Sequence, residues 1–141
     1  MYLLDTNVIS EIRKGDKGNR GVKAFVQHLA TSQSPAFLAA VTIGELRRGV
    51  AVLEHRGDAS QARVLAVWLE DVLKLFGKSV IVFDEPCAQV WGRLMVPHTS
   101  SPVDKQIAAT AIVHQLTLVT RNIRDFQNTG ARLQNPFTEE N

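Results

Sequence analysis

Four acidic residues of this chain lie next to short apolar runs. Asp5 and Glu45 each follow a run that has the composition of a buried strand. Asp125 follows the last such run, and Asp104 begins a segment with helical spacing. In open α/β sheets the binding crevice lies outside the carboxyl ends of the strands. We therefore expect these acids to share one edge of a sheet.

Carboxylates gathered at one edge raise one another's pKa values, because their negative charges repel. A hard divalent cation between them removes this conflict. Carboxylate oxygens and water are the ligands that Mg²⁺ and Mn²⁺ prefer. A cation held there can polarise a phosphate and activate a water for hydrolysis. The acids therefore predict a metal-dependent hydrolytic site.

Three of the four acids also have a purely structural alternative. Asp5 suits the N-cap of a helix. Glu45 follows Thr42 with the spacing of a capping box. Asp104 would lie in the dipole-favoured first turn of a helix that Ser101 caps. These alternatives stay open for each residue alone, but they do not explain why several acids gather at one edge.

Polar neighbours of the acids are candidates for supporting roles. Thr6 and Asn7 follow Asp5 and could orient its carboxylate or hold a metal-bound water, although Thr6 could instead cap a helix. Thr120 ends the last apolar run and joins this supporting group. Guanidinium groups near the acidic segments could bind RNA phosphates, or could belong to solvent-exposed residues without a binding role. They are Arg47, Arg48, Arg121 and Arg124.

Alternating strands and helices must position these residues. Uniformly apolar runs predict buried strands at 2–4, 36–41, 80–83 and 116–120. Helical spacing follows at 6–14, from about residue 22, and at 58–76, where an apolar stripe indicates core packing or part of a homodimer face. This order predicts a three-layer α/β/α sandwich with a central parallel sheet, in a single domain spanning 1–141. We expect the polar end, 138–141, to be frayed.

Composition excludes several classes of protein. The chain has 141 residues and one cysteine, Cys87, so it forms no internal disulfide and no cysteine-based metal site. No apolar run approaches the ~20 residues of a membrane span, and we expect a cytoplasmic protein. The net charge of +2 permits an RNA partner without proving one. Glycine-rich nucleotide-binding loops and a serine nucleophile elbow are absent from the sequence.

Taken together, five sequence blocks resemble the PIN-domain family, particularly its VapC and FitB toxins. The blocks are LDTNVISE at 4–11, TIGELRRG at 42–49, FDEP at 83–86, DKQIAATA at 104–111 and LTLVTRN at 116–122. Each block is short, but their order and spacing match the family over nearly the whole chain.

The resemblance implies an endoribonuclease that uses Mg²⁺ or Mn²⁺ and a metal-activated water. It also implies a homodimer or a higher complex with a small antitoxin, through which alone the toxin meets operator DNA. Asp5, Glu45 and Asp104 carry over as metal-binding and catalytic acids. Many members have Asp directly after the Thr-Arg pair, where this chain has Asn122. We therefore place Asp125 in the catalytic set and keep Asn122 as a candidate metal ligand.

Two rival functions remain open. In a phosphatase or receiver domain, a lone Asp after the first strand is a nucleophile, but Asp5 lacks the second acid of an Asp-x-Asp pair. The other rival is a catalytically weakened PIN-fold binding module that acts through its complex with antitoxin and operator DNA. Asn122 favours this rival, because it stands where many members of the family have an acidic residue. The sequence does not identify which RNA is cut, because every RNA presents the same phosphates.

Overall fold

A five-stranded parallel sheet forms the centre of the computed structural model, which describes residues 1–139. The strand order is β3-β2-β1-β4-β5, and every neighbouring pair is parallel. The strands are β1 (Tyr2–Leu4), β2 (Ala36–Ala39), β3 (Val80–Ile81), β4 (Thr117–Val119) and β5 (Arg132–Gln134). β1 lies in the middle, so the residue that follows it emerges at the centre of the sheet edge.

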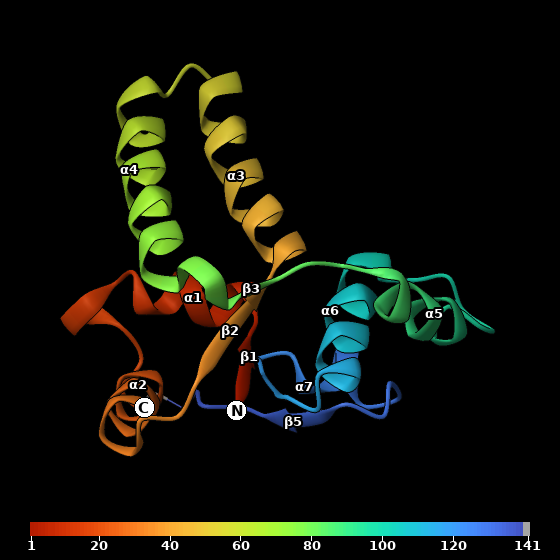
Figure 1. The fold of residues 1–141 in the computed structure, drawn as a ribbon. Coiled ribbons are helices and arrows are strands. Elements are labelled where there is room, and N and C mark those ends of the chain that lie inside the picture. Colours follow the sequence, from red (N-terminus) through yellow and green to blue (C-terminus); the bar gives the residue numbers. More distant parts are fainter. Residues whose placement is uncertain (140–141) are drawn as a thin grey trace.

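Seven α-helices connect and cover the strands in the described part of the chain. They are α1 (Thr6–Ile12), α2 (Arg20–Ser32), α3 (Ala40–His55), α4 (Ala59–Phe76), α5 (Glu85–Leu94), α6 (Pro102–Val113) and α7 (Ile123–Phe126), with 3-10 turns at Gly15–Lys17 and Gly77–Ser79. Figure 1 shows α3 and α4 as a long antiparallel pair that projects from the sheet, with α5 and α6 beside each other.

Two apolar cores lie on opposite faces of the sheet, because successive strand side chains point to opposite sides. Leu4 packs with α1, α2, α3 and α4 on one face. Leu3 packs with α6 and α7 on the other. This arrangement confirms the predicted three-layer α/β/α sandwich with a parallel sheet.

The apolar stripe of α4 divides between core and surface. Leu69 and Val72 are buried in the first core, and Trp68 packs against it. Val64 is instead 56% exposed. The core-packing interpretation of the stripe is therefore confirmed for its central positions.

Each of the predicted strands is present, although three of them are shorter than expected. The fifth strand, β5, was missed by the sequence analysis. It pairs Leu133 with Leu118 of β4, while Arg132 and Gln134 are exposed. An edge strand with one apolar side chain between two polar ones carries little of the signal of a buried strand.

The C-terminal segment is tied to the start of α2. Asn19 caps α2 by accepting from the backbone N–H of Gly21, and it also accepts from the N–H of Thr138 at 3.0 Å. Its amide donates to the carbonyl of Thr138 at 2.8 Å. The expectation that 138–141 is frayed is therefore wrong for Thr138, because a buried amide fixes its backbone; residues 140–141 lie outside the described part.

Gly21 is required by this close approach. A Cβ atom at this position would stand 2.1 Å from the carbonyl oxygen of Pro136. Atoms that are not bonded to each other do not approach this closely, so any side chain here would push the C-terminal segment away from α2.

Within the described residues, no helix is both long and apolar enough to cross a membrane.

Candidate active site

Asp5 lies at the carboxyl end of β1, where three groups hold its carboxylate. One oxygen accepts from the backbone N–H of Thr6 at 2.8 Å. The other accepts from the hydroxyl of Thr120 at 2.7 Å and from the amide of Asn7 at 3.3 Å. Burial raises the pKa of Asp5, and these hydrogen bonds act in the opposite direction. Asp5 is thus the N-cap of α1 and also a fixed acid at the sheet edge.

Glu45 is held beside Asp5 by Thr6, whose hydroxyl donates to the Glu45 carboxylate at 2.6 Å. Thr6 therefore joins two acids and does not cap the helix. The capping-box alternative for Glu45 is wrong, because α3 begins at Ala40 and its N-cap is Ala39. Thr42 is then inside the first turn, and its buried hydroxyl has no partner among the described residues.

Asp104 lies in the first turn of α6, as its position after Pro102 predicts. Ser101 has φ of 52° and makes no side-chain capping bond, so the expected serine cap is absent. Burial is the largest cause that raises the pKa of Asp104 to about 6, followed by the charges of Asp5, Glu45 and Asp125. These three carboxylates therefore lie close enough to Asp104 to repel it.

Asn122 and Asp125 lie at the two ends of one turn after β4. Asn122 is the N-cap residue of α7, and its carbonyl accepts from the backbone N–H of Asp125 at 3.0 Å. Its own N–H donates to the hydroxyl of Thr120 at 3.0 Å. Both side chains are exposed. The charge of Asp125 reaches Asp104, whereas Asn122 brings no charge.

The side chain of Thr120 links Asp5 to the turn that follows β4. Thr120 is fully buried, and its hydroxyl donates to Asp5 while accepting from Asn122. Asn7 accepts in turn from the backbone N–H of Arg121 at 3.1 Å. Sequence reasoning placed Thr120 near the site from its position alone, and its hydrogen bond to Asp5 had no signal in the sequence.

The four acids form one electrostatic cluster, here called the acid cluster: Asp5, Glu45, Asp104 and Asp125. Within residues 1–139, no three acid, histidine or cysteine side chains stand in a ready-made metal-ligand arrangement. The side chains of the acid cluster offer only oxygen ligands. The pKa of Asp104 is raised, and a bound cation would lower it again. These residues therefore fit a hard divalent cation by their chemistry.

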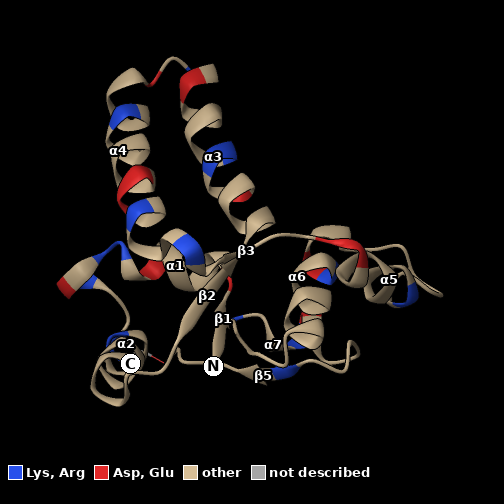
Figure 2. Ribbon diagram, viewed as in Figure 1, with Lys and Arg blue, Asp and Glu red and all other residues tan. Residues whose placement is uncertain are grey.

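The arginines predicted to contact RNA are all exposed. Arg47 and Arg48 lie on α3 within one turn of Glu45, and Arg124 lies on α7 beside Asp125. Figure 2 shows basic segments of α3 along the same helix as acidic ones, and further acidic segments near the end of β1 and in α6. Their contacts with RNA stay predictions.

We expect Asp125 to supply the fourth carboxylate. Asp125→Ala should weaken Mn²⁺ binding by at least about tenfold, because the cation loses a charged oxygen ligand. Asn122→Ala should have less effect, and Asn122→Asp should strengthen binding. Isothermal titration of Mn²⁺ measures all three, with Glu70→Ala on the outer face of α4 as a control. If Asn122→Ala binds weakly and Asp125→Ala binds like the parent, the assignment is reversed.

Known proteins share this fold over almost the whole chain. A model of the PIN domain matches residues 2–131. The toxin FitB of Neisseria gonorrhoeae is 35% identical, and the alignment covers 97% of this chain and 99% of FitB. The VapC ribonuclease Y4jK of Sinorhizobium fredii is 32% identical over 97% and 98% of the two chains. A structure of FitAB bound to an IR36 DNA fragment superposes with a TM-score of 0.80 at 32% identity, covering 100% and 99%. The chain belongs to the PIN-domain family.

Proposed function

We propose that this protein is a Mg²⁺- or Mn²⁺-dependent endoribonuclease and the toxin of a toxin–antitoxin pair. One observation carries the proposal: Asp5, Glu45 and Asp125 together raise the pKa of Asp104, which burial already raises, to about 6. A fold needs no such like-charge cluster for stability, since it costs free energy unless a cation binds there. A relative of similar length is named a ribonuclease, which supports RNA as the substrate.

The acid cluster would hold the cation, and each residue contributes differently. Asp5 is fixed by Thr120 and Asn7, so it would be the least mobile ligand. Glu45 is oriented by Thr6. Asp104 and Asp125 lie on separate helices, α6 and α7. When bound, a divalent cation polarises the scissile phosphate and lowers the pKa of an attacking water.

The proposal predicts that cleavage requires a divalent cation. Purified protein should cleave RNA in Mg²⁺ or Mn²⁺, lose cleavage in excess EDTA, and regain it when Mn²⁺ is restored. Oxygen-only ligands leave no other source of a nucleophile near neutral pH. Gel analysis of a labelled RNA measures this. Cleavage that continues unchanged in excess EDTA would contradict the mechanism.

The same assay tests the alternative, a catalytically weakened binding module. Asn122 is the observation that favours this alternative, because it replaces a charged ligand with an amide. A weakened site would bind Mn²⁺ poorly and leave RNA intact at any metal concentration. Asn122→Asp would then create cleavage that the parent chain lacks.

An apolar groove supports the proposal of a small antitoxin partner. The groove has a volume of about 390 Å³ and lies between α1, α2 and α4, with Ile12, Leu29 and Trp68 among its lining residues. Leu75 at its edge is 81% exposed. FitAB, whose solved complex superposes on this chain, binds DNA. We therefore propose that the antitoxin buries an apolar segment here, places a basic side chain near the acid cluster, and alone contacts operator DNA.

Leu75→Glu should release this partner, because a charge at the groove edge opposes apolar burial. The matched control is Val64→Glu, which changes an exposed α4 residue outside the groove lining. Pull-down from the native host should recover one small protein with the parent and with Val64→Glu, and lose it with Leu75→Glu. Equal recovery with both variants would place the partner elsewhere.

A further inference from the structure

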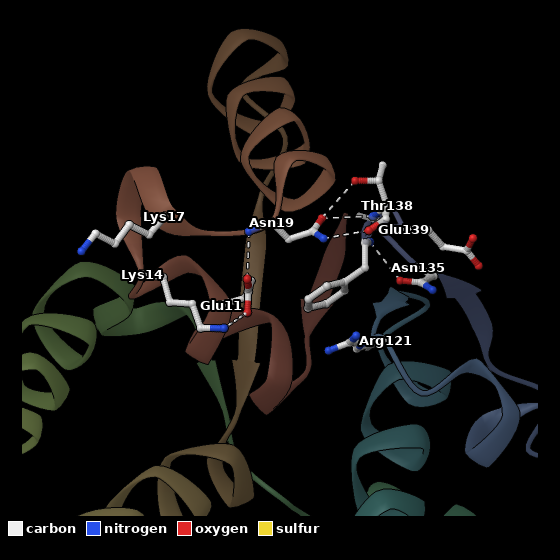
Figure 3. A pocket seen from close by; sticks show the side chains of 9 residues that line it. Glu11, Lys14, Lys17, Asn19, Arg121, Asn135, Thr138 and Glu139 are labelled. Atoms are coloured by element: carbon white, nitrogen blue, oxygen red, sulfur yellow. Dashed lines mark hydrogen bonds and ion pairs between the residues drawn. The ribbon is translucent and has the colours of Figure 1, made fainter. Parts of the chain in front are cut away.

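A polar pocket lies beside the acid cluster, between the end of α1 and the C-terminal segment (Figure 3). Its volume is about 560 Å³. We propose that this pocket, here called the flanking pocket, binds a phosphate of the substrate RNA next to the bond that is cut, between Lys14 and Arg121. The inference rests on the proposed ribonuclease function and deepens it, since it assigns a second site to the same substrate.

The flanking pocket is connected to the acid cluster by two short routes. Arg121 directly follows Thr120, the residue that donates to Asp5, and its backbone N–H donates to Asn7. Glu11 lines the pocket on α1, the helix that Asp5 caps. Glu11 lies six residues after Asp5, which corresponds to a rise of about 9 Å along the helix. An RNA strand with one phosphate at the acid cluster would therefore bring a neighbouring phosphate to this pocket.

Three basic residues line the pocket: Lys14, Lys17 and Arg121. Lys17 points away from the other two (Figure 3), and of those two only Lys14 has a carboxylate partner among residues 1–139. The Lys14 ammonium lies 2.8 Å from the Glu11 carboxylate, which is the only ion pair among residues 1–139. Arg121 therefore has no carboxylate partner in that part of the chain. Figure 3 shows Lys14 and Arg121 pointing toward the same opening from opposite sides, while the Glu139 carboxylate points away.

The charge of Glu11 is offset in this pocket by Lys14 and, at longer range, by Arg121. One of its oxygens contacts Lys14, and the other accepts from the backbone N–H of Asn19 at 2.8 Å. Lys14 keeps further N–H donors for a phosphate after it has bound Glu11. Glu11 thus holds the Lys14 ammonium at the pocket wall. The planar fork of Arg121 can bind two phosphate oxygens at once.

Phe137 positions Arg121. The guanidinium carbon of Arg121 lies 5.0 Å from the centre of the Phe137 ring, a cation–π contact that fixes the direction of the side chain. Phe137 is held in turn by the bonds between Asn19 and Thr138. The C-terminal segment therefore forms one wall of the pocket and sets the place of the Arg121 guanidinium. Such preorganisation lowers the entropy lost when an anion binds.

Kinetics on the full-length chain test the proposal. Arg121→Ala and Lys14→Ala should each raise KM for RNA by about tenfold with kcat nearly unchanged, because a phosphate contact away from the cut bond contributes uniform binding. The slope of log affinity against log salt should fall by about 0.7 for each RNA phosphate that the variant no longer neutralises. Lys74→Ala on α4 removes an equal charge outside the pocket and should change neither quantity.

The role of Phe137 has its own readout. Phe137→Leu should raise KM less than Arg121→Ala does, and should add nothing in the Arg121→Ala background, because it acts through that arginine. A residue that only stabilised the fold would add its effect in both backgrounds.

Binding measurements separate this inference from the proposed function. The affinity of a fluorescent single-stranded oligoribonucleotide is measured in the Asp104→Asn background, which is expected not to cut, and should fall about tenfold with Arg121→Ala. If the parent cleaves RNA while Arg121→Ala and Lys14→Ala leave KM and affinity unchanged, the pocket proposal fails and the ribonuclease stands. If those variants weaken only the antitoxin complex, the pocket takes a protein carboxylate and the proposal is overturned. A parent chain that cleaves no RNA in Mn²⁺ overturns both.

Discussion

Asp104→Asn is expected to lower RNA cleavage on the order of a thousandfold and also to stabilise the metal-free protein. Cleavage falls because the cation loses a carboxylate ligand. Stability rises because Asp104 is the acid on which burial and three like charges act together, which raises its pKa to about 6. An amide of the same size removes the repulsion and keeps the packing.

The sign of the pH dependence follows from the same shift. The pKa of Asp104 is about 6 in the folded chain and 3.8 for the unperturbed group. The folded state therefore binds this proton more tightly, and the contribution of Asp104 to the stability of the metal-free protein falls as pH rises from about 4 to about 6. Above a pH of about 6 the loss in the free energy of unfolding that Asp104 causes is complete. After allowance for solvent screening, it is on the order of 1 kcal/mol, or about 3 °C in Tm.

Thermal unfolding in EDTA at pH 4, 5, 6 and 8 measures this effect. The Tm of Asp104→Asn relative to the parent should rise across the series, so that the variant melts higher than the parent at pH 8. The matched control is Glu70→Gln on α4, whose Tm relative to the parent should not change across the series. A lower Tm for Asp104→Asn at pH 8 would indicate that the charge of Asp104 mainly stabilises the first turn of α6.

The order of strands and helices was predictable because each buried strand is a short, uniformly apolar run. Leu3 and Leu4 face different cores, so both must be apolar, and the run ends where Asp5 leaves the sheet. The acid cluster was predictable for the same reason, since carboxyl ends of parallel strands meet at one edge. The metal and the RNA remain predictions that rest on the chemistry of those acids.

Contacts between distant segments were not predictable from local pattern. Asn19 and Thr138 are polar residues in polar surroundings, and only the folded chain brings them together. Thr6 has equal sequence grounds for capping α1 or for orienting a carboxylate of the site, and the approach of α3, which brings Glu45 to its hydroxyl, decides between them. The contact of Phe137 with Arg121 likewise arises only because the segment after β4 and the C-terminal segment meet in the folded chain.

Asp5→Ala should also lower cleavage on the order of a thousandfold, but it should destabilise the metal-free protein. Three donors converge on the Asp5 carboxylate, from Thr120, Thr6 and Asn7. Thr120 is fully buried, so its hydroxyl loses an acceptor that water does not replace. Unsatisfied donors cost about 1 to 3 kcal/mol each, which outweighs the relief of burying one fewer charge, and we expect a net loss of about 2 kcal/mol.

Urea unfolding in EDTA gives this free energy directly, and a second substitution tests its cause. Thr120→Val in the Asp5→Ala background removes a hydroxyl whose donated bond is already lost, while its bond from the backbone N–H of Asn122 is still made, so it should cost less stability there than in the parent. In the parent, the same Thr120→Val should destabilise, because it breaks a bond of 2.7 Å to Asp5. The two acids should therefore affect stability in opposite directions although we expect both to be needed for cleavage. If Asp5→Ala instead stabilises the metal-free chain as Asp104→Asn does, the charge of Asp5 outweighs its hydrogen bonds, and Asp5 shares the repulsion assigned here to Asp104.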